Sequence, residues 1–336
     1  MCLRFAIIGC GRIAEKHAIE IKKNGILAAV CDIDKQKVTE FANKHNSAPY
    51  FSIEEMLADN TINIDIVSVC TPNGLHYTHT VNALNAGKNV LCEKPMSIKS
   101  DDAKEMIRLA ATLNKQLIIV KSARYNPILT GLKKLIENGG LGKICSFSLS
   151  CCWNRPDAYY ANSWRGTREL DGGILFTQFS HYIDIIIWLF GQYSIISGFR
   201  KNFLHTDSIQ LEDTGVISLK TQNGIIGSVH YTVNAAIKNQ EIALNIISEK
   251  ATVQLGGEYM NKVIYQNPVV LHTNKIELPN PANDYGFYKG SMSNHDKVYE
   301  NVINALNGRE NNITDGSEAL KTVQFIEAFY KTATLF

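Results

Sequence analysis

The chain has 336 residues, of which 45% are hydrophobic and 20% are charged, and its formal net charge is +2. This length exceeds the usual size of a single domain, so we expect two domains. The near-neutral charge offers no electrostatic footprint for nucleic acid or an anionic membrane, and no apolar run approaches the length of a membrane span. We therefore expect a globular protein without a nucleic-acid or membrane partner, whose anionic ligands are held by local sites.

The start of the chain and its cysteines predict the cellular compartment. The first four residues lead straight into an apolar strand rather than into a signal peptide. The eight cysteines show no metal-ligand spacing, and several fall at strand ends, where a thiol behaves as a small buried hydrophobe. The simplest interpretation is a cytoplasmic protein with reduced thiols and no metal site.

The first 120 residues alternate between apolar strand patterns and helix patterns. Repeated strand–helix units of this length require parallel pairing with right-handed crossovers. We therefore predict a Rossmann-type, doubly wound parallel sheet for residues 1–121. Strands are predicted at 5–8, 26–31, 49–51, 65–70, 88–92 and 116–120, and helices at 12–24, 35–45, 75–86 and 100–113, with a further helix after Ser52.

The pattern changes after residue 121, where a few helices are followed by many strands. The dipeptide Asn223-Gly224 between two apolar runs is a strong hairpin signal. Such an order indicates an α+β domain over residues 122–336 with an open, mainly antiparallel sheet, whose closing helices could pack back on the first domain. Helices are predicted at 126–138, 174–190, 293–306 and 317–332, a long strand at 143–153, and further strands between 194 and 271.

A glycine-rich turn after the first strand predicts a dinucleotide site. Gly9 permits a tight turn and Gly11 lets the backbone approach a pyrophosphate. Arg12 and Ile13 begin a helix whose N-terminal N–H groups and dipole attract phosphates. Asp32 ends the second strand about 20 residues beyond the turn, where a carboxylate binds the ribose hydroxyls of adenosine. We therefore predict NAD as the cofactor, with a bare structural turn as the alternative.

Further cofactor contacts are expected at the carboxyl ends of the next strands, because ligands of an open parallel sheet lie there. One strand ends at Thr71-Pro72-Asn73, followed by His76, and another ends at Glu93-Lys94. Lys94 would lie close to a nicotinamide, where its ammonium could bind a substrate hydroxyl or lose a proton. The alternative interpretation of the Glu-Lys pair is a solvated ion pair.

A second group of polar residues lies in the most apolar predicted helix. Gln178, His181 and Asp184 are spaced three apart, so they would share one face of that helix. Together with Lys94, His181 could take the proton of a substrate hydroxyl while a hydride leaves its carbon. The alternative is a histidine satisfied within the core, and the pattern leaves open whether lysine or histidine is the immediate proton acceptor.

Three motifs together resemble the glucose–fructose oxidoreductase / inositol dehydrogenase (Gfo/Idh/MocA) family over essentially the whole chain. They are Gly9-x-Gly11-x-x-Ala14, Glu93-Lys94-Pro95 and a glycine pair eight residues before His181. The resemblance implies that Lys94 and His181 are the catalytic pair. It also implies that the second domain binds substrate and forms a homodimer or homotetramer through its sheet. The chain departs from many members in carrying Thr177 where they have aspartate.

A narrower resemblance is to the nucleotide-sugar 3-dehydrogenases of bacterial surface-polysaccharide biosynthesis, closest to those that oxidise UDP-N-acetylglucosaminuronate. It is carried by Trp153-Asn154-Arg155-Pro156, Trp164-Arg165-Gly166-Thr167 and Asp171-Gly172-Gly173, with Gln178. It implies NAD-dependent oxidation of the C3 hydroxyl of a UDP-linked N-acetylhexosamine or its uronic acid to the 3-keto sugar, in surface-polysaccharide or lipopolysaccharide precursor biosynthesis. Expected substrate contacts are Lys94, Tyr159, Trp164, Arg165, Gln178 and His181.

The loop 154–169 is expected to border the substrate site. Its arginines can hold phosphate or carboxylate bidentately, and its aromatic rings can stack on a base or cover a sugar face. The stretch 285–295 could close over the nucleotide. Two alternatives stay open: a free-sugar or inositol dehydrogenase of the same family, and a non-enzymatic dinucleotide-binding regulator, which would not need Lys94 and His181 together. The sugar's C6 group is either a carboxylate or a hydroxymethyl group, and an oxo acid could recycle the NADH.

Overall fold

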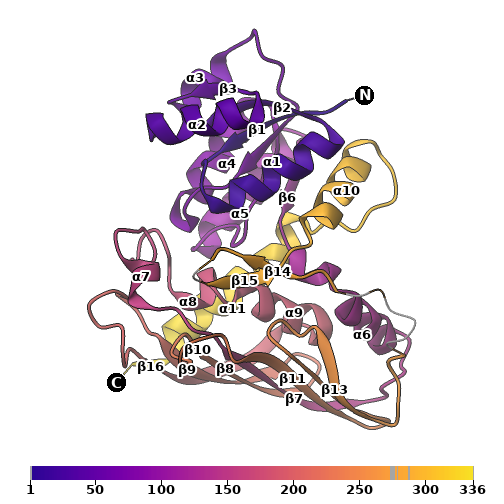
Figure 1. Cartoon of the computed structure of the whole chain (residues 1–336). Helices are drawn as coiled ribbons and strands as arrows, with labels where there is room; N and C mark the ends of the chain where they lie inside the picture. The colour runs from indigo at the N-terminus through magenta and orange to yellow at the C-terminus, as the bar shows by residue number, and fades with distance from the viewer. Residues whose placement is uncertain (1, 273–276, 278, 287, 336) are drawn as a thin grey trace. The chain divides into compact units, whose positions relative to one another are not determined.

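The computed structural model of the chain describes residues 2–272, 277, 279–286 and 288–335. These residues form two compact units, and Figure 1 labels most of their helices and strands. The first unit comprises the chain up to Lys121 together with His295–Val323, and the second comprises Ser122–Asn294 together with the chain from Gln324 onward. The chain therefore completes most of the second unit before it returns to the first.

The first unit is built on a six-stranded sheet in which every neighbouring pair of strands is parallel. Its spatial order is β3-β2-β1-β4-β5-β6, so the order reverses between β1 and β4. This confirms the predicted doubly wound sheet, which binds ligands at the reversal, beyond the carboxyl ends of its strands. The strands are β1 (Arg4–Ile8), β2 (Ile26–Cys31), β3 (Ala48–Tyr50), β4 (Ile66–Val69), β5 (Asn89–Cys92) and β6 (Leu117–Ile119), and the helices are α1 (Arg12–Asn24), α2 (Lys35–His45), α3 (Ile53–Ala58), α4 (His76–Asn85), α5 (Ser100–Thr112) and α10 (His295–Leu306).

The first turn of this unit requires glycine. Gly9 follows β1 with a φ of +92°, a conformation that residues with a side chain rarely adopt. A Cβ atom at this position would also lie 2.9 Å from the backbone carbonyl of Cys70, which follows the neighbouring strand β4. The missing side chain therefore lets the ends of β1 and β4 meet and fixes where α1 begins.

The second unit is built on an open sheet of eight strands in the order β13-β12-β11-β7-β10-β9-β8-β16. The pairs β7–β10 and β8–β16 are parallel and the other pairs are antiparallel, which confirms the predicted sheet type. The strands are β7 (Ile144–Cys152), β8 (Tyr193–Lys201), β9 (Thr214–Thr221), β10 (Ile226–Thr232), β11 (Glu241–Ser248), β12 (Thr252–Gly256), β13 (Lys262–Asn267) and β16 (Thr334–Leu335). The helices are α6 (Pro127–Glu137), α7 (Asp157–Tyr160), α8 (Ile174–Thr177) and α9 (Ser180–Phe190). A further helix, α11 (Gly316–Thr332), begins in the first unit and ends in the second.

One face of this sheet carries the core of the second unit. Along β9 the side chains of Ile217 and Leu219 are buried while that of Val216 is exposed, as expected for a half-buried strand. Helix α9 packs on the buried face, where the rings of Phe147 and Phe190 stack with their centroids 4.5 Å apart. The sheet thus supports α9, the helix that carries His181.

The prediction of one long helix around His181 is wrong, because the segment forms two helices. A wide turn separates α8 from α9, and in it the N–H groups of Gln178 and Phe179 both donate to the carbonyl of Ile174. At the end of α8 the hydroxyl of Thr177 donates to the carboxylate of Asp171. Phe179 within the break is apolar and buried, and neither glycine nor proline occurs there, so the sequence pattern does not mark the break. Gln178 therefore does not share a helix with His181 and Asp184.

Two short strands that were not predicted lie near the end of the second unit. β14 (Ala282–Asp284) and β15 (Lys289–Met292) pair antiparallel within and just before the stretch 285–295. Residue 287 of that stretch lies outside the described residues. Among the residues that are described, no helix is long and apolar enough to cross a membrane.

Candidate active site

The predicted phosphate-binding turn lies between β1 and α1. The Gly9 N–H donates to the carbonyl of Cys31 at the end of β2, and Gly11 precedes α1 without a capping side chain. A Cβ atom placed on Gly11 would meet nothing within 4 Å, so the space beside this glycine is open. Arg12 and Ile13 form the first turn of α1, whose N–H groups and dipole suit a pyrophosphate at that place.

Asp32 is tied to the same turn. Its Oδ2 accepts the N–H of Cys10 at 2.8 Å, and its Oδ1 accepts the N–H of Asp34 at 3.0 Å. The ammonium of Lys37 lies 4.0 Å from Oδ2. The backbone thus fixes both oxygens of a carboxylate that keeps part of its surface exposed. This geometry supports the predicted role of Asp32 as acceptor for the ribose hydroxyls.

We expect the protein to bind NAD more tightly than NADP. A 2′-phosphate would meet the Asp32 carboxylate, and the two negative charges would repel each other. Asp32→Asn should lower the ratio of the Kd for NADP to the Kd for NAD by about tenfold or more, because it removes that repulsion. Titration of both cofactors into the purified protein measures the preference, with the exposed Asp101→Asn as the control. Tighter binding of NADP by the unchanged protein would contradict the prediction.

His76 joins the two turns that were predicted to contact the cofactor. Its Nδ1 lies 2.6 Å from the carbonyl of Pro95, and its Nε2 lies 2.8 Å from the carbonyl of Thr71. Burial lowers the pKa of His76, although both carbonyls oppose this shift. Pro72 and Asn73 continue the first turn into a short 3-10 helix. Since both ring nitrogens face backbone carbonyls, His76 holds the turns in place rather than presenting a ring nitrogen to NAD.

Glu93 and Lys94 follow β5, but the Glu93 carboxylate is occupied by protein donors. Its Oε1 lies 3.0 Å from Nε2 of His17 and 3.3 Å from Nε2 of His295, and its Oε2 accepts the N–H of Lys94 at 3.0 Å. Sequence analysis missed both histidines, which lie 76 and 202 residues away from Glu93. Glu93 is buried and Lys94 is half-buried. The glutamate is therefore placed to support the lysine.

His181 lies in the first turn of α9, in the second unit. It is buried, and its Nε2 lies 3.2 Å from the hydroxyl of Ser291 on β15. Asp184, one turn further on, is held by Arg124, whose Nε and Nη2 bind the two carboxylate oxygens at 2.7 and 3.0 Å. Lys94 belongs to the first unit, so the two predicted catalytic residues come from different units.

Gln178 and Ser180 stand at the break between α8 and α9. Gln178 is only 3% exposed, and neither atom of its amide has a hydrogen-bond partner in the described part of the chain. The hydroxyl of Ser180 is buried and equally lacks a partner there. Buried polar groups of this kind are rare, and a ligand or ordered water normally completes them. The break therefore presents hydrogen-bonding groups that a bound molecule could use, and Ser180 was not among the predicted substrate contacts.

Arg155 and Arg165 both stack on aromatic rings of the loop 154–169. The guanidinium carbon of Arg165 lies 4.8 Å from the ring centre of Tyr159 and 4.9 Å from that of Trp164. Arg155 is buried and donates to two backbone carbonyls. Arg155 therefore holds the loop, whereas Arg165 is half-buried and its Nη1 donates to the hydroxyl of Ser163 in the same loop at 3.2 Å.

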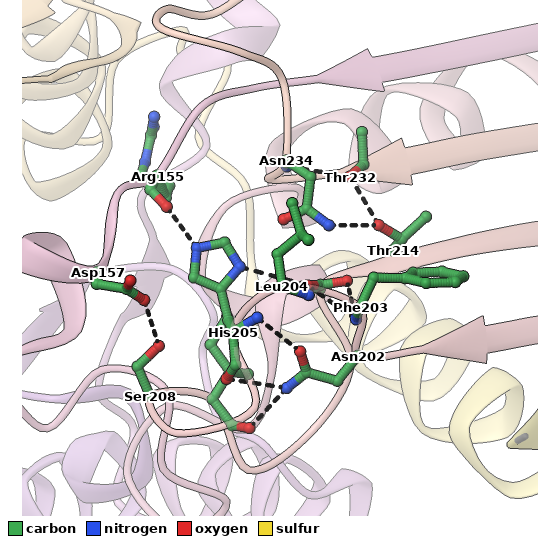
Figure 2. A network of polar contacts seen from close by, with 12 residues as sticks. Arg155, Asp157, Asn202, Phe203, Leu204, His205, Ser208, Thr214, Thr232 and Asn234 are labelled. Carbon is green, nitrogen blue, oxygen red and sulfur yellow. Dashed lines mark hydrogen bonds and ion pairs between the residues drawn. The ribbon is translucent and has the colours of Figure 1, made fainter.

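A polar network anchors the start of this loop, as Figure 2 shows. Nε2 of His205 lies 2.8 Å from the carbonyl of Arg155, and its Nδ1 lies 3.3 Å from the carboxylate of Asp213. That carboxylate also accepts the N–H groups of Phe203 and Leu204. Because a carbonyl and a carboxylate are both acceptors, the ring satisfies both only when it is doubly protonated. The hydrogen bond to Asp213 accordingly raises the pKa of His205.

Asp171 anchors the other end of the loop. Its carboxylate is fully buried and accepts the N–H of Gly166 at 2.5 Å as well as the hydroxyl of Thr177. Gly166 directly follows Arg165 in the chain. The buried carboxylate therefore fixes the backbone that carries the arginine predicted to bind substrate.

Comparison with known protein families defines the class of this chain. A model described as the oxidoreductase family, NAD-binding Rossmann fold, matches residues 3–121, and the family's C-terminal alpha/beta domain matches residues 133–334. This is the class of oxidoreductases with an NAD-binding Rossmann domain. The chain belongs to the Gfo/Idh/MocA family, and its cofactor is NAD.

Two solved structures are similar over nearly the whole length. The WlbA dehydrogenase from Bordetella pertussis, in complex with NADH and UDP-GlcNAcA, is 31% identical with a TM-score of 0.88, covering 99% of this chain and 96% of that one. WlbA from Chromobacterium violaceum, with the same two ligands, is 32% identical with a TM-score of 0.88, covering 98% and 93%. Among curated proteins, the D-glucoside 3-dehydrogenase of Escherichia coli (strain K12) is 25% identical over 98% of this chain and 95% of its own. The resemblance seen in the motifs is confirmed.

Proposed function

We propose that this protein works in the cytoplasm and uses NAD to oxidise the C3 hydroxyl of a UDP-linked N-acetylhexosamine, or of its uronic acid, to the 3-keto sugar. The step would belong to surface-polysaccharide or lipopolysaccharide precursor biosynthesis. The observation that carries the proposal is the likeness, at 31% and 32% identity over nearly the whole chain, to two dehydrogenases solved with NADH and UDP-GlcNAcA. The name of the E. coli relative, D-glucoside 3-dehydrogenase, supports C3 as the position of oxidation.

Side chains of the second unit support a sugar nucleotide as the ligand. Arg165, stacked on Tyr159 and Trp164, offers a guanidinium to a diphosphate or a carboxylate. The buried groups of Gln178 and Ser180 would be completed by sugar hydroxyl or acetamide groups. These groups favour a polar ligand, because an apolar one would leave them unpaired.

The proposed chemistry needs a proton acceptor as well as a hydride acceptor. NAD, when bound, accepts the hydride from C3 of the sugar. The proton of the C3 hydroxyl passes to Lys94 or to His181, and the C–O bond becomes the carbonyl of the 3-keto sugar. Lysine can accept this proton only as the neutral amine, a form that its surroundings can favour, and histidine can accept it because its neutral ring is populated near neutral pH.

The test is incubation of the purified protein with NAD and a panel of UDP-sugars that differ at C2, C4 and C6. NADH absorbance follows the reaction, and mass spectrometry should find a product lighter by two hydrogen atoms, with the new carbonyl at C3. A parallel series contains an oxo acid, which would reoxidise NADH that stays bound. Oxidation of free sugars or inositols alone would overturn the proposal and support the free-sugar alternative, which the D-glucoside relative favours.

A substitution of Arg165 tests whether the substrate is a UDP-sugar rather than a free sugar or inositol. We expect Arg165→Lys to raise the KM for the UDP-sugar by about tenfold, because an ammonium loses both the bidentate geometry and the stacking of a guanidinium. The Kd for NAD should not change. Arg168→Lys, at an exposed arginine of the same loop, is the matched control. Equal KM values in the two variants would mean that Arg165 does not bind the nucleotide sugar.

We also propose that the protein forms a homodimer or homotetramer through the open face of the second-unit sheet. Ile195, Phe199, Val216 and Ile226 lie on this face and are between 43% and 65% exposed. Apolar side chains gathered on one exposed face are typical of protein interfaces. Light scattering should report a multiple of the chain mass, which Ile226→Lys should lower. A monomeric unchanged protein would contradict this proposal.

A further inference from the structure

A buried cluster in the first unit surrounds the residue that precedes Lys94. Glu93, His17 and His295 are 6%, 0% and 4% exposed, respectively. The proposed reaction uses neither histidine directly, and both donate toward the same carboxylate oxygen. Burial of two imidazoles and a carboxylate is costly unless they bind one another. Their arrangement therefore needs an explanation beyond the packing of the unit.

The hydrogen bonds of this cluster all run toward the Glu93 carboxylate. Burial would raise the pKa of Glu93, but the hydrogen bonds from His17 and His295 hold it well below its usual range, so the carboxylate is ionised. Burial lowers the pKa of His17 and keeps its ring neutral. A neutral ring that donates from Nε2 accepts at Nδ1, here from the hydroxyl of Tyr299 at 2.7 Å. Ser68, 3.1 Å from the same oxygen, donates to Tyr299 in turn.

Separate parts of the chain contribute to the cluster. His17 comes from α1, and Glu93 follows β5, while His295 and Tyr299 come from α10, where the chain has returned to the first unit. The rings of His17 and His295 meet edge to face with centroids 5.3 Å apart. Donors from two helices, α1 and α10, fix the orientation of the carboxylate, so the N–H of Lys94 is held by a group that does not rotate away.

We propose that His17, His295 and Tyr299 are positioning residues for Lys94 and act through the Glu93 carboxylate. The carboxylate fixes the backbone of Lys94 and places a permanent negative charge beside it. Glu93 and Lys94 both act electrostatically on the buried His76, so the two charges share one environment. The inference rests on the proposed function, since it requires Lys94 to take part in the chemistry.

Removal of the Glu93 charge is the first test. In Glu93→Gln the side chain keeps its shape but no longer favours the protonated state of a neighbouring ammonium. The pH at which kcat is half-maximal should therefore fall by about one unit, whether the lysine acts charged or neutral. kcat should fall by about tenfold or more while the Kd for NAD stays within about threefold. Among the described residues, the other titratable groups that face the cluster include Glu20, Cys70, His76 and Cys92, and all remain in this variant.

The donor from His17 is the second test. His17→Leu fills a similar volume without a donor and should lower kcat about tenfold, whereas His17→Gln retains an N–H donor and should restore kcat to within about threefold of the unchanged protein. A packing role alone would be served at least as well by leucine. His45→Leu is the matched control, because His45 is buried in the same unit and bonds Glu15 rather than Glu93.

The outcomes separate this inference from the proposed function. The absence of UDP-sugar oxidation by the unchanged protein would overturn the proposed function itself, whereas a Lys94→Ala protein with normal turnover of the UDP-sugar would overturn the inference. If Lys94→Ala is inactive, two results would overturn only the inference. One is an unchanged pH midpoint of kcat in Glu93→Gln, and the other is an equal kcat in His17→Leu and His45→Leu. The ligand atoms of His17, Glu93 and His295 also lie within 4.8 Å of one another, as those of a metal site do. Loss of activity in EDTA with recovery in Zn²⁺ would show a metal site and likewise overturn the positioning role.

Discussion

Lys94→Ala and His181→Asn are each expected to lower the turnover number by about 100-fold or more, the scale of a lost general acid–base group. Lys94 follows β5 with its backbone held by Glu93, and His181 lies in the first turn of α9. Either substitution removes a group that could accept the proton of the sugar hydroxyl. Single-turnover measurement of NADH formation separates this loss from slow product release.

NAD binding should be nearly unchanged in both variants, because Gly9, Gly11 and Asp32 remain. Lys99→Ala and His230→Asn change exposed residues of the same types and serve as matched controls. Normal turnover of His181→Asn would mean that this histidine is structural and that the proton goes elsewhere.

The double variant tests whether Lys94 and His181 act as one unit. If both serve a single proton transfer, the double variant should be about as slow as the slower single variant, since such effects are not additive. Losses that multiply would instead indicate that the two residues act in separate steps.

The parallel sheet could be predicted because each of its determinants is local in sequence. The Gly9 turn and Asp32 lie within one strand–helix–strand unit, and the continuous apolar runs of β1 and β2 match strands that are buried on both faces of a parallel sheet. In the second unit β7 pairs with β10 and β11, although β8 and β9 lie between them in the chain. Alternating hydrophobicity shows which face of a strand is buried, but it does not name the neighbouring strand.

Site residues that belong to a sequence motif could be predicted, whereas residues that come together only in the folded chain were missed. Glu93 and Lys94 form a motif at a strand end, whereas His295 reaches Glu93 only because the chain returns to the first unit. The signal for His17 was present, since it follows Ala14 by three residues on the buried face of α1. The loop arginines were alike in sequence, and burial separates Arg155, which holds the loop, from the half-buried Arg165.

Asp213→Asn is expected to destabilise the second unit by about 3–5 kcal/mol, the cost of breaking a buried charge pair. The carboxylate is fully buried, accepts the N–H groups of Phe203 and Leu204, and faces His205. An amide would turn one of the acceptor oxygens into a donor that faces other donors, so buried N–H groups would lose their partner.

The pKa shifts of this pair give the pH range in which it stabilises the unit. Burial would raise the pKa of Asp213, but hydrogen bonds from His205 and the backbone lower it. The contribution of Asp213 to the stability of the unit is therefore present above its unfolded pKa of about 3.9 and is lost as the pH falls toward its folded pKa. The hydrogen bond to Asp213 raises the pKa of His205, so that contribution is present below about pH 6.5 and is lost as pH rises through the raised pKa. The pair should stabilise the unit most between about pH 4 and about pH 6.5.

Tryptophan fluorescence can follow this unit selectively, because Trp153, Trp164 and Trp188 all belong to it. In urea unfolding, the unchanged protein should lose stability as the pH rises above about 6.5 and His205 loses its proton, and His205→Gln should flatten that slope. Asp207→Asn changes an exposed aspartate in the segment between β8 and β9, which also contains His205 and Asp213, and should alter neither stability nor slope. The network ends on the carbonyl of Arg155, so Asp213→Asn should also raise the KM for the UDP-sugar by loosening the loop that carries Arg165. An Asp213→Asn protein as stable as the unchanged one would show that this network does not anchor the loop.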